Sequence, residues 1–262
     1  MMDDQLKVWL DRDNQVLRLR LARPKANIID AAMIDALSTA LTEHATNSRL
    51  MAVVLDAEGP HFSFGASVEE HLPTECAGML NKLHALIMQM IEFPAPIIAA
   101  VHGQCLGGGL EVVCACNVII AGPDSKLGQP EISLAVFAPA ASCLLPERIG
   151  QSQAEMLLLS GESVDAERAL QMRLVDEVSD EPPAAALAWI DKNIIGKSAS
   201  SLRIAVTAVR HDYVARIRKK LATVEAMYLE ELMKTDDAVE GLNAFLEKRK
   251  PVWKNDTKGA DK

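Results

Sequence analysis

Two glutamates and a run of three glycines are the residues whose types and spacing could support catalysis. Gly107, Gly108 and Gly109 stand between an apolar strand-like segment and an apolar helix-like segment. Glycines at the start of a helix leave backbone N–H groups open to an anion, either a phosphate or a developing oxyanion. The run fits neither G-x-G-x-x-G nor a P-loop. Tight packing of the helix on the strand is the alternative explanation.

Glu111 follows these glycines and is the only charged residue between His102 and Asp124. Burying an ionised, unpaired carboxylate costs on the order of several kcal/mol, so Glu111 either has a partner or lies in a pocket that raises its pKa. Glu131 comes twenty positions later, directly after Pro130. Its apolar neighbours favour pairing with Glu111 as an acid/base couple. The alternatives are a buried ion pair for Glu111 and a solvated loop position for Glu131.

A second backbone donor is offered by the loop Phe64–Ser67, where Gly65 lets the chain turn so that the next N–H can face a pocket. The histidines show no metal-binding pattern: His61 and His71 lie ten residues apart without a cysteine or carboxylate to complete a site. We therefore expect no metal, and we expect these histidines at the surface or behind the reacting groups.

The composition describes an acidic folded protein. Its 262 residues are 49% hydrophobic and 24% charged, with a net charge of −9, which excludes whole-chain disorder and argues against a nucleic-acid binder. The longest apolar stretch, near residues 93–101, is far shorter than the roughly 20 residues that span a bilayer. The acidic start has no signal-like apolar region. We expect no membrane partner, a cytoplasmic location, and inert buried thiols for the five cysteines.

Strand-like and helix-like segments alternate in the first half of the chain, which predicts an α/β core with crossover connections. The expected segments are a hairpin at 6–10 and 16–21, a helix capped by Asp30, a strand at 51–55, a helix at 74–91, and strands at 97–101 and 117–121. Residues 198–249 are helical in character, and the last dozen residues form a solvated tail. Residues 1–195 carry a net charge of −13 and residues 196–262 a net charge of +4, which predicts two parts.

Five segments, in order and spacing, resemble the crotonase (enoyl-CoA hydratase/isomerase) superfamily: Arg23–Asn27, His61–Ser67, Gly103–Glu111, Gly128–Glu131 and Glu240–Arg249. The resemblance covers essentially the full chain. It implies a spiral of ββα units as the catalytic core, residues 1–195, followed by a helical oligomerisation region, residues 196–262. It also implies a homotrimer or a hexamer built as a dimer of trimers.

The resemblance further implies a coenzyme A thioester as substrate and no separate cofactor. The thioester oxygen would lie between the N–H groups of Ala66 and Gly108, the positions that match the oxyanion hole of the family. Glu111 and Glu131 match the two glutamates that hold and activate water in hydratases, although which one is the acid stays open. The matching positions for other substrate contacts are Lys25, Ala26, Ser67, Val68, Glu69, Phe137 and Lys248, the last from a neighbouring subunit.

Two segments depart from the family pattern, and the second of them covers the acyl pocket in the family. The loop that commonly reads A-G-A-D is Phe64–Ser67 here, and the usual P-G-x-G-G stretch is replaced by Ala135–Cys143, which includes the bulky Phe137. Together with Ser67–His71 and Leu221–Leu232, this pattern is most similar to hydratases that add water in a 1,4 manner to a conjugated cyclic dienoyl-CoA in anaerobic aromatic degradation. The alternatives are hydration of short-chain or cyclic monoenoyl-CoA, nucleic-acid binding and a non-catalytic trimeric scaffold.

Overall fold

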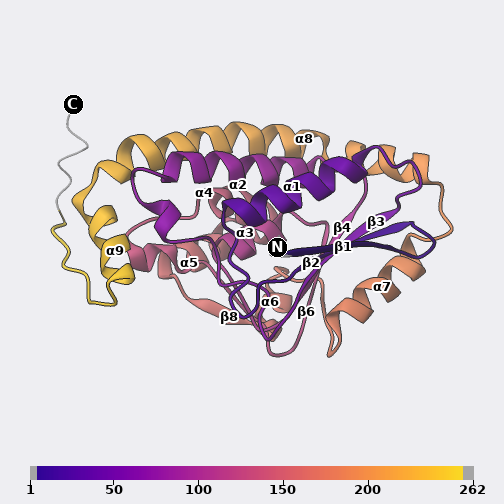
Figure 1. Cartoon of the computed structure of the whole chain (residues 1–262), viewed down its shortest axis with the longest axis horizontal. Coiled ribbons are helices and arrows are strands. Elements are labelled where there is room, and N and C mark those ends of the chain that lie inside the picture. Colours follow the sequence, from indigo (N-terminus) through magenta and orange to yellow (C-terminus); the bar gives the residue numbers. More distant parts are fainter. Residues whose placement is uncertain (1–4, 256–262) are drawn as a thin grey trace.

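Two β-sheets lie at the centre of the structure, and helices pack around them (Figure 1). The computed structural model describes residues 5–255. Within this range one sheet has six strands in the order β1-β2-β3-β4-β6-β9, and the other has three in the order β5-β7-β8. The strands are β1 Leu6–Asp11, β2 Val16–Leu21, β3 Ala52–Ala57, β4 Ile97–Val101, β5 Gln104–Leu106, β6 Val118–Ala121, β7 Lys126–Gly128, β8 Ser163–Asp165 and β9 Glu177–Val178.

The helices follow the alternation that the sequence predicts. They are α1 Ala31–Ala45, α2 Cys76–Ile91, α3 Gly108–Cys114, α4 Pro139–Ile149, α5 Gln151–Ser160, α6 Ala166–Gln171, α7 Pro182–Asn193, α8 Ala199–Ala226 and α9 Asp236–Leu246. The Asp30 side chain accepts a hydrogen bond from the Met33 N–H at 3.0 Å, so the expected N-cap of α1 is confirmed. The antiparallel pairing of β1 with β2 confirms the hairpin.

The chain alternates between the two sheets, and this alternation generates the spiral. β4 lies in the large sheet, β5 in the small sheet, and α3 follows; β6 and β7 repeat the same step. β4 pairs in parallel with β6, and β5 pairs in parallel with β7. After β3 the chain also passes beside the small sheet, where Ser63 forms a single parallel bridge with Cys105 of β5. The loops that follow these small-sheet positions therefore lie beside one another.

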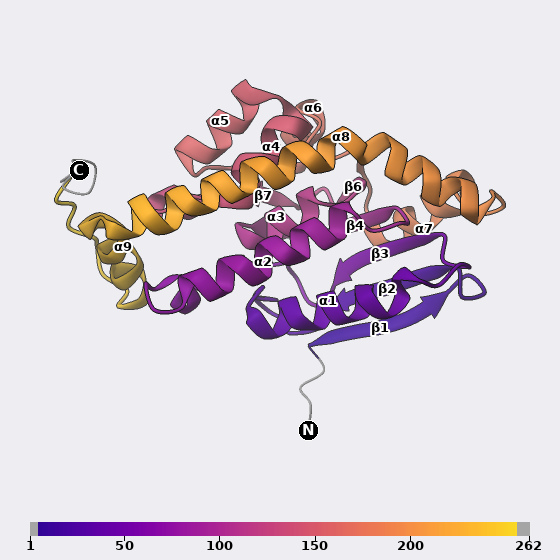
Figure 2. The same ribbon diagram turned by 90° about the horizontal axis from the view of Figure 1, so that it is seen from above.

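The C-terminal helices share the hydrophobic core of the large sheet. Figure 2 shows α8 running beside α2, and it contacts both α2 and α4. Ile217, Leu221 and Tyr228 belong to the same buried cluster as the strands of the large sheet. The boundary at residue 195 stays a prediction, and residues 256–262 of the expected tail lie outside the described range. Between residues 5 and 255, the helices are too short or too polar to cross a membrane.

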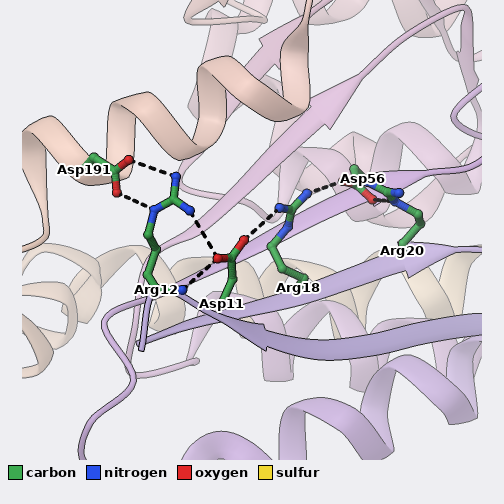
Figure 3. A network of polar contacts seen from close by, with 6 residues as sticks. All are labelled: Asp11, Arg12, Arg18, Arg20, Asp56 and Asp191. Atoms are coloured by element: carbon green, nitrogen blue, oxygen red, sulfur yellow. Dashed lines mark hydrogen bonds and ion pairs between the residues drawn. The ribbon is translucent and has the colours of Figure 1, made fainter. Parts of the chain in front are cut away.

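A network of ion pairs fastens the hairpin to the next strand (Figure 3). Asp56 on β3 has no exposed surface and accepts hydrogen bonds from Arg18 at 2.7 Å and from Arg20 at 2.6 Å. The guanidinium groups of both arginines lie over the Trp9 ring, at 5.1 and 5.2 Å from its centroid. Arg18 is itself only 5% exposed, so its buried positive charge is compensated by the Asp56 carboxylate and by a longer bond to Asp11.

Replacing Asp56 with alanine should therefore destabilise the fold strongly. Loss of one partner from a buried ion pair costs about 3–5 kcal/mol because a buried charge stays behind. Asp191→Ala is the matched control: it removes a bidentate bond to Arg12 at the exposed end of the same network, where a pair contributes at most about 1 kcal/mol. Urea unfolding of both variants measures the two losses, and equal losses would contradict this account.

Candidate active site

A small cavity lies where the loop Phe64–Ser67 meets the start of α3. Its volume is about 110 Å³. Its wall is formed by Phe64, Gly65, Ala66, Val68, His71, Gly107, Glu131, Leu134, Val136, Leu242 and Phe245. A larger open groove of about 630 Å³ runs between α2 and α8, but the two candidate glutamates and the glycine run do not line it. Of the four predicted catalytic positions, Ala66 and Glu131 line the small cavity, whereas Gly108 and Glu111 are not part of its lining.

The backbone at Gly108 lies close to the backbone at Ala66, which lines this cavity; their role as an oxyanion hole stays a prediction. Ser63 fixes the loops side by side, since its N–H donates to Gln104 at 3.0 Å and its carbonyl accepts from Leu106 at 3.0 Å. A Cβ atom on Gly108 would lie 3.1 Å from the Ala66 nitrogen, so a side chain there would push the loops apart. In residues 5–255 neither N–H has an acceptor, and both are available to an oxyanion.

Glu111 lies in the first turn of α3 and is 4% exposed. Its Oε1 accepts a hydrogen bond at 2.8 Å from the Ala141 N–H, one of the N–H groups that the start of α4 leaves without a helical partner. Burial raises the pKa of Glu111, and the Ala141 and Ala140 amides lower it in part. The carboxyl is thus held by a helix N-terminus and not by a structural ion pair, which favours the proton-transfer interpretation.

Glu131 lies in the 3₁₀ turn Pro130–Leu134 and forms part of the cavity wall. Its Oε1 occupies the space that a Cβ atom on Gly107 would need. With its amide nitrogen turned toward the carboxylate, the buried Gln129 donates to both oxygens at 3.0 and 3.1 Å. Burial raises the pKa of Glu131, and the nearby Glu111 carboxylate raises it further. Two coupled carboxyls with raised pKa values can hold one proton between them near neutral pH.

Among the other predicted contact positions, Val68 is the one that lines the cavity, beside Ala66. Ser67 lies next to the wall, but its hydroxyl donates to the exposed Glu69 at 2.9 Å. Phe137 packs edge-on against Tyr228, with ring centroids 5.3 Å apart, and stands outside the cavity lining. The roles of Ser67, Glu69 and Phe137 stay predictions.

The positions expected to contact coenzyme A, Lys25, Ala26 and Lys248, are not part of the cavity lining. Lys25 is exposed, and the neighbouring Ala26 carbonyl accepts a hydrogen bond from the Phe64 N–H at 2.9 Å. Lys248 is exposed and follows α9 by two residues. In this chain α9 lines the cavity of its own subunit through Leu242 and Phe245. The roles of these three positions also stay predictions.

His71 is a cavity residue that the sequence analysis expected elsewhere. Its Nδ1 lies 2.6 Å from the Ser67 carbonyl oxygen, so this nitrogen carries the hydrogen and donates. Burial lowers the pKa of the ring, which favours the neutral imidazole. Its spacing of four residues from Ser67, whose carbonyl it contacts, was the only local signal. Leu242 and Phe245 were also missed, because more than 100 residues separate them from the glutamates.

The known proteins that this chain matches agree with the fold and with the predicted family. Residues 11–256 match enoyl-CoA hydratase/isomerase, and the chain belongs to this family. It is 62% identical over 250 residues to cyclohexa-1,5-dienecarbonyl-CoA hydratase of Thauera aromatica, covering 95% of this chain and 97% of the relative. A probable enoyl-CoA hydratase of Bacillus subtilis is 34% identical over 256 residues, covering 93% and 97%. The crystal structure of an enoyl-CoA hydratase from Mycobacterium avium matches with a TM-score of 0.85 at 26% identity, covering 95% and 99%.

The raised pKa of Glu131 predicts a pH-dependent cost to stability. Above the usual carboxyl pKa of about 4.3, the folded state keeps a proton that the unfolded state releases, so stability falls as pH rises toward the folded pKa. Glu131→Gln removes this cost. Its stability relative to the unmodified protein should increase between about pH 5 and pH 9, by about 1.4 kcal/mol per unit of pKa shift removed.

Urea unfolding at several pH values measures this difference. Glu162→Gln, at an exposed residue on the chain between α5 and β8, is the matched control and should track the unmodified protein at every pH. Parallel curves for Glu131→Gln and the unmodified protein would show that the carboxyl titrates normally, and the account of the pair would be wrong.

Proposed function

We propose that this protein hydrates cyclohexa-1,5-diene-1-carbonyl-CoA to 6-hydroxycyclohex-1-ene-1-carbonyl-CoA, a hydro-lyase reaction in anaerobic aromatic degradation. The observation that carries the proposal is the 62% identity to the Thauera aromatica hydratase over 95% of this chain. The site supports it, because both glutamates and both open N–H groups needed for hydration of a thioester are present.

In the proposed mechanism, water held by Glu111 and Glu131 attacks the ring carbon β to the thioester. A carbon–oxygen bond forms, one proton of the water moves to a carboxylate, and the electrons of the double bond shift toward the thioester oxygen. The Ala66 and Gly108 N–H groups donate to this oxygen. Loss of one comparable donor costs about 3–4 kcal/mol of transition-state stabilisation in other enzymes, so this pair would supply a large share of the rate.

The second double bond of the ring decides where the proton returns. This second double bond is attached to the ring carbon that carries the thioester, so it is conjugated with the enolate. The negative charge of the enolate therefore extends to the far carbon of this double bond. A carboxyl then protonates the carbon across the ring from the new hydroxyl, and one double bond remains conjugated with the thioester. The net change is a 1,4-addition of water, and the glutamate pair regains its single shared proton.

The shape of the cavity supports a cyclic acyl group. Leu134, Val136 and Leu242 contribute apolar side chains to its wall. Its volume of about 110 Å³ is close to that of an apolar protein cavity that accepts benzene, about 150 Å³. A six-membered ring therefore matches the scale of the cavity better than a long acyl chain does.

Hydration of a short-chain or cyclic monoenoyl-CoA is the second candidate. The observation in its favour is the 34% identity to the probable enoyl-CoA hydratase of Bacillus subtilis. The two reactions differ in the carbon that is protonated. A monoenoyl substrate has no second double bond, so the proton returns to the α carbon.

Turnover in D₂O separates these candidates. With the cyclic diene thioester, we expect efficient hydration and one deuterium on the ring carbon opposite the hydroxyl-bearing carbon, located by NMR. Crotonyl-CoA should be a poor substrate. Efficient hydration of crotonyl-CoA without turnover of the diene would replace the proposal with the second candidate.

The same experiment tests whether the reaction takes place at this cavity, with the variants Glu111→Gln and Glu131→Gln. Each removes a proton-transfer group while keeping the size of the side chain, and each should lower kcat by about 10²-fold to 10⁴-fold. Circular dichroism should show an unchanged fold. Full activity in either variant would refute the two-glutamate mechanism. Inactivity of the unmodified protein on both thioesters would favour the scaffold alternative.

The proposal includes assembly into a homotrimer or hexamer through the C-terminal helices, and a cytoplasmic location, where acyl-CoA thioesters occur. Large apolar side chains on α8 support the assembly, since Ile204 is 70% exposed and Val209 is 83% exposed. Light scattering should give three or six times the mass of the chain, and Val209→Lys should reduce it. A monomer at micromolar concentration would contradict the proposed assembly.

A further inference from the structure

His71 is a titratable side chain in the wall of the small cavity, together with Glu131, and the mechanism above gives it no role. It is the last residue of the 3₁₀ turn Glu69–His71. The Glu70 carboxylate accepts a hydrogen bond from the Ala31 N–H at 3.1 Å, so this turn is fastened to the start of α1. The backbone that carries the imidazole is therefore held at a fixed place.

The two ring nitrogens of His71 have different surroundings. Nδ1 lies 2.6 Å from the Ser67 carbonyl oxygen and carries the hydrogen of that bond. Nε2 has no hydrogen-bond partner among residues 5–255 and keeps accessible surface, unlike the Nε2 atom of His84, which is fully buried. Burial lowers the pKa of the His71 ring, so the neutral form is favoured and Nε2 has a free lone pair. A residue of the cavity wall thus has an open hydrogen-bond acceptor.

This acceptor is useful only to a ligand that has a hydrogen to donate. The cavity volume of about 110 Å³ is on the scale of one six-membered ring, so a ring that lies against Glu131 also lies close to His71. The diene ring consists of carbon and hydrogen and has nothing to donate to Nε2. After hydration the ring carries a hydroxyl group, whose hydrogen needs an acceptor inside the protein. The lone pair therefore distinguishes the hydrated ring from the unhydrated one.

We propose that His71 is a specificity-determining residue whose Nε2 accepts a hydrogen bond from the hydroxyl that hydration places on the ring. The class of ligand that it recognises is a cyclic hydroxyacyl thioester. Once the glutamate pair has its shared proton again, a carboxyl can donate to the hydroxyl oxygen while the hydroxyl donates to Nε2. This inference rests on the proposed hydration, and it adds a contact to the bound product and not another proton-transfer group.

His71→Asn tests the inference, because the asparagine amide can still donate to the Ser67 carbonyl but is too short to replace Nε2. The two ligands are 6-hydroxycyclohex-1-ene-1-carbonyl-CoA and cyclohex-1-ene-1-carbonyl-CoA, which differ by one hydroxyl group. Each is measured as a competitive inhibitor of the hydration reaction. We expect the inhibition constant of the hydroxylated thioester to rise by about 3-fold to 10-fold, the effect of one lost hydrogen bond. The constant of the other thioester should change by less than about twofold.

His44→Asn is the matched control, because His44 Nδ1 also lies beside the carbonyl oxygen four residues earlier, that of Ala40, at 2.9 Å. His44 lies on α1 and outside the cavity lining, so both inhibition constants should stay unchanged. His71→Leu also lacks an acceptor and gives the same comparison if His71→Asn does not fold.

Two results would overturn the inference. One is an unchanged inhibition constant for the hydroxylated thioester in the His71 variants, which would show that Nε2 does not contact the hydroxyl. The other is an equal rise for both thioesters, since the imidazole would then act by packing alone.

The comparison stays readable if the proposed substrate is wrong. Hydration of crotonyl-CoA without hydration of the diene would reject that substrate, and the His71 variants are then compared with 3-hydroxybutyryl-CoA and butyryl-CoA. A protein that hydrates neither thioester also dehydrates neither product, so titration calorimetry with the two cyclic thioesters measures the same difference without turnover. In each case a loss of affinity confined to the hydroxylated ligand supports the role of His71, and an unselective result rejects it.

Discussion

The site depends on the close approach of two backbone segments, the loop at Ala66 and the start of α3 at Gly107 and Gly108. A side chain at Gly108 would collide with Ala66, and one at Gly107 would collide with the Glu131 carboxylate. One pair of glycines therefore lets the two backbone segments approach and also leaves space for the carboxyl of Glu131. The bonds of Ser63 to the neighbouring small-sheet strand hold the two segments in this register.

The two carboxyls are expensive to bury, and the structure does not neutralise them with cations. Glu111 receives backbone N–H groups from α4, and Glu131 receives the amide of Gln129. These donors are neutral, so they hold the carboxylates in place without forcing both to ionise, as an arginine would. Stability is supplied elsewhere, by the large sheet and by networks such as Arg18 with Asp56. This separation is typical of enzymes whose sites trade stability for activity.

The sequence predicted the large sheet better than the small one, for a physical reason. Runs such as Ile97–Val101 are long enough to show an apolar pattern, whereas β5, β7 and β8 have three residues each and show none. Glu111 stood out because a lone charge in an apolar segment needs an explanation. His71 and Phe245 carried no comparable signal, because their place at the cavity results from packing between distant segments. The buried state of all five cysteines was predicted correctly.

The different supports of the two glutamates explain how one pair could serve a 1,4-addition. Glu111 is fixed to a helix start, while Glu131 stands on a short 3₁₀ turn at the cavity wall. Addition of water across a ring requires a base at one carbon and an acid at the carbon opposite, so the two groups must approach different parts of the same ring. The two carboxyls share one proton at the start. When one carboxylate accepts a second proton from water, the other carboxyl can release its own. In the proposed mechanism the pair would thus complete the addition without drawing a proton from bulk solvent, and the apolar residues of the wall would exclude water from the enolate.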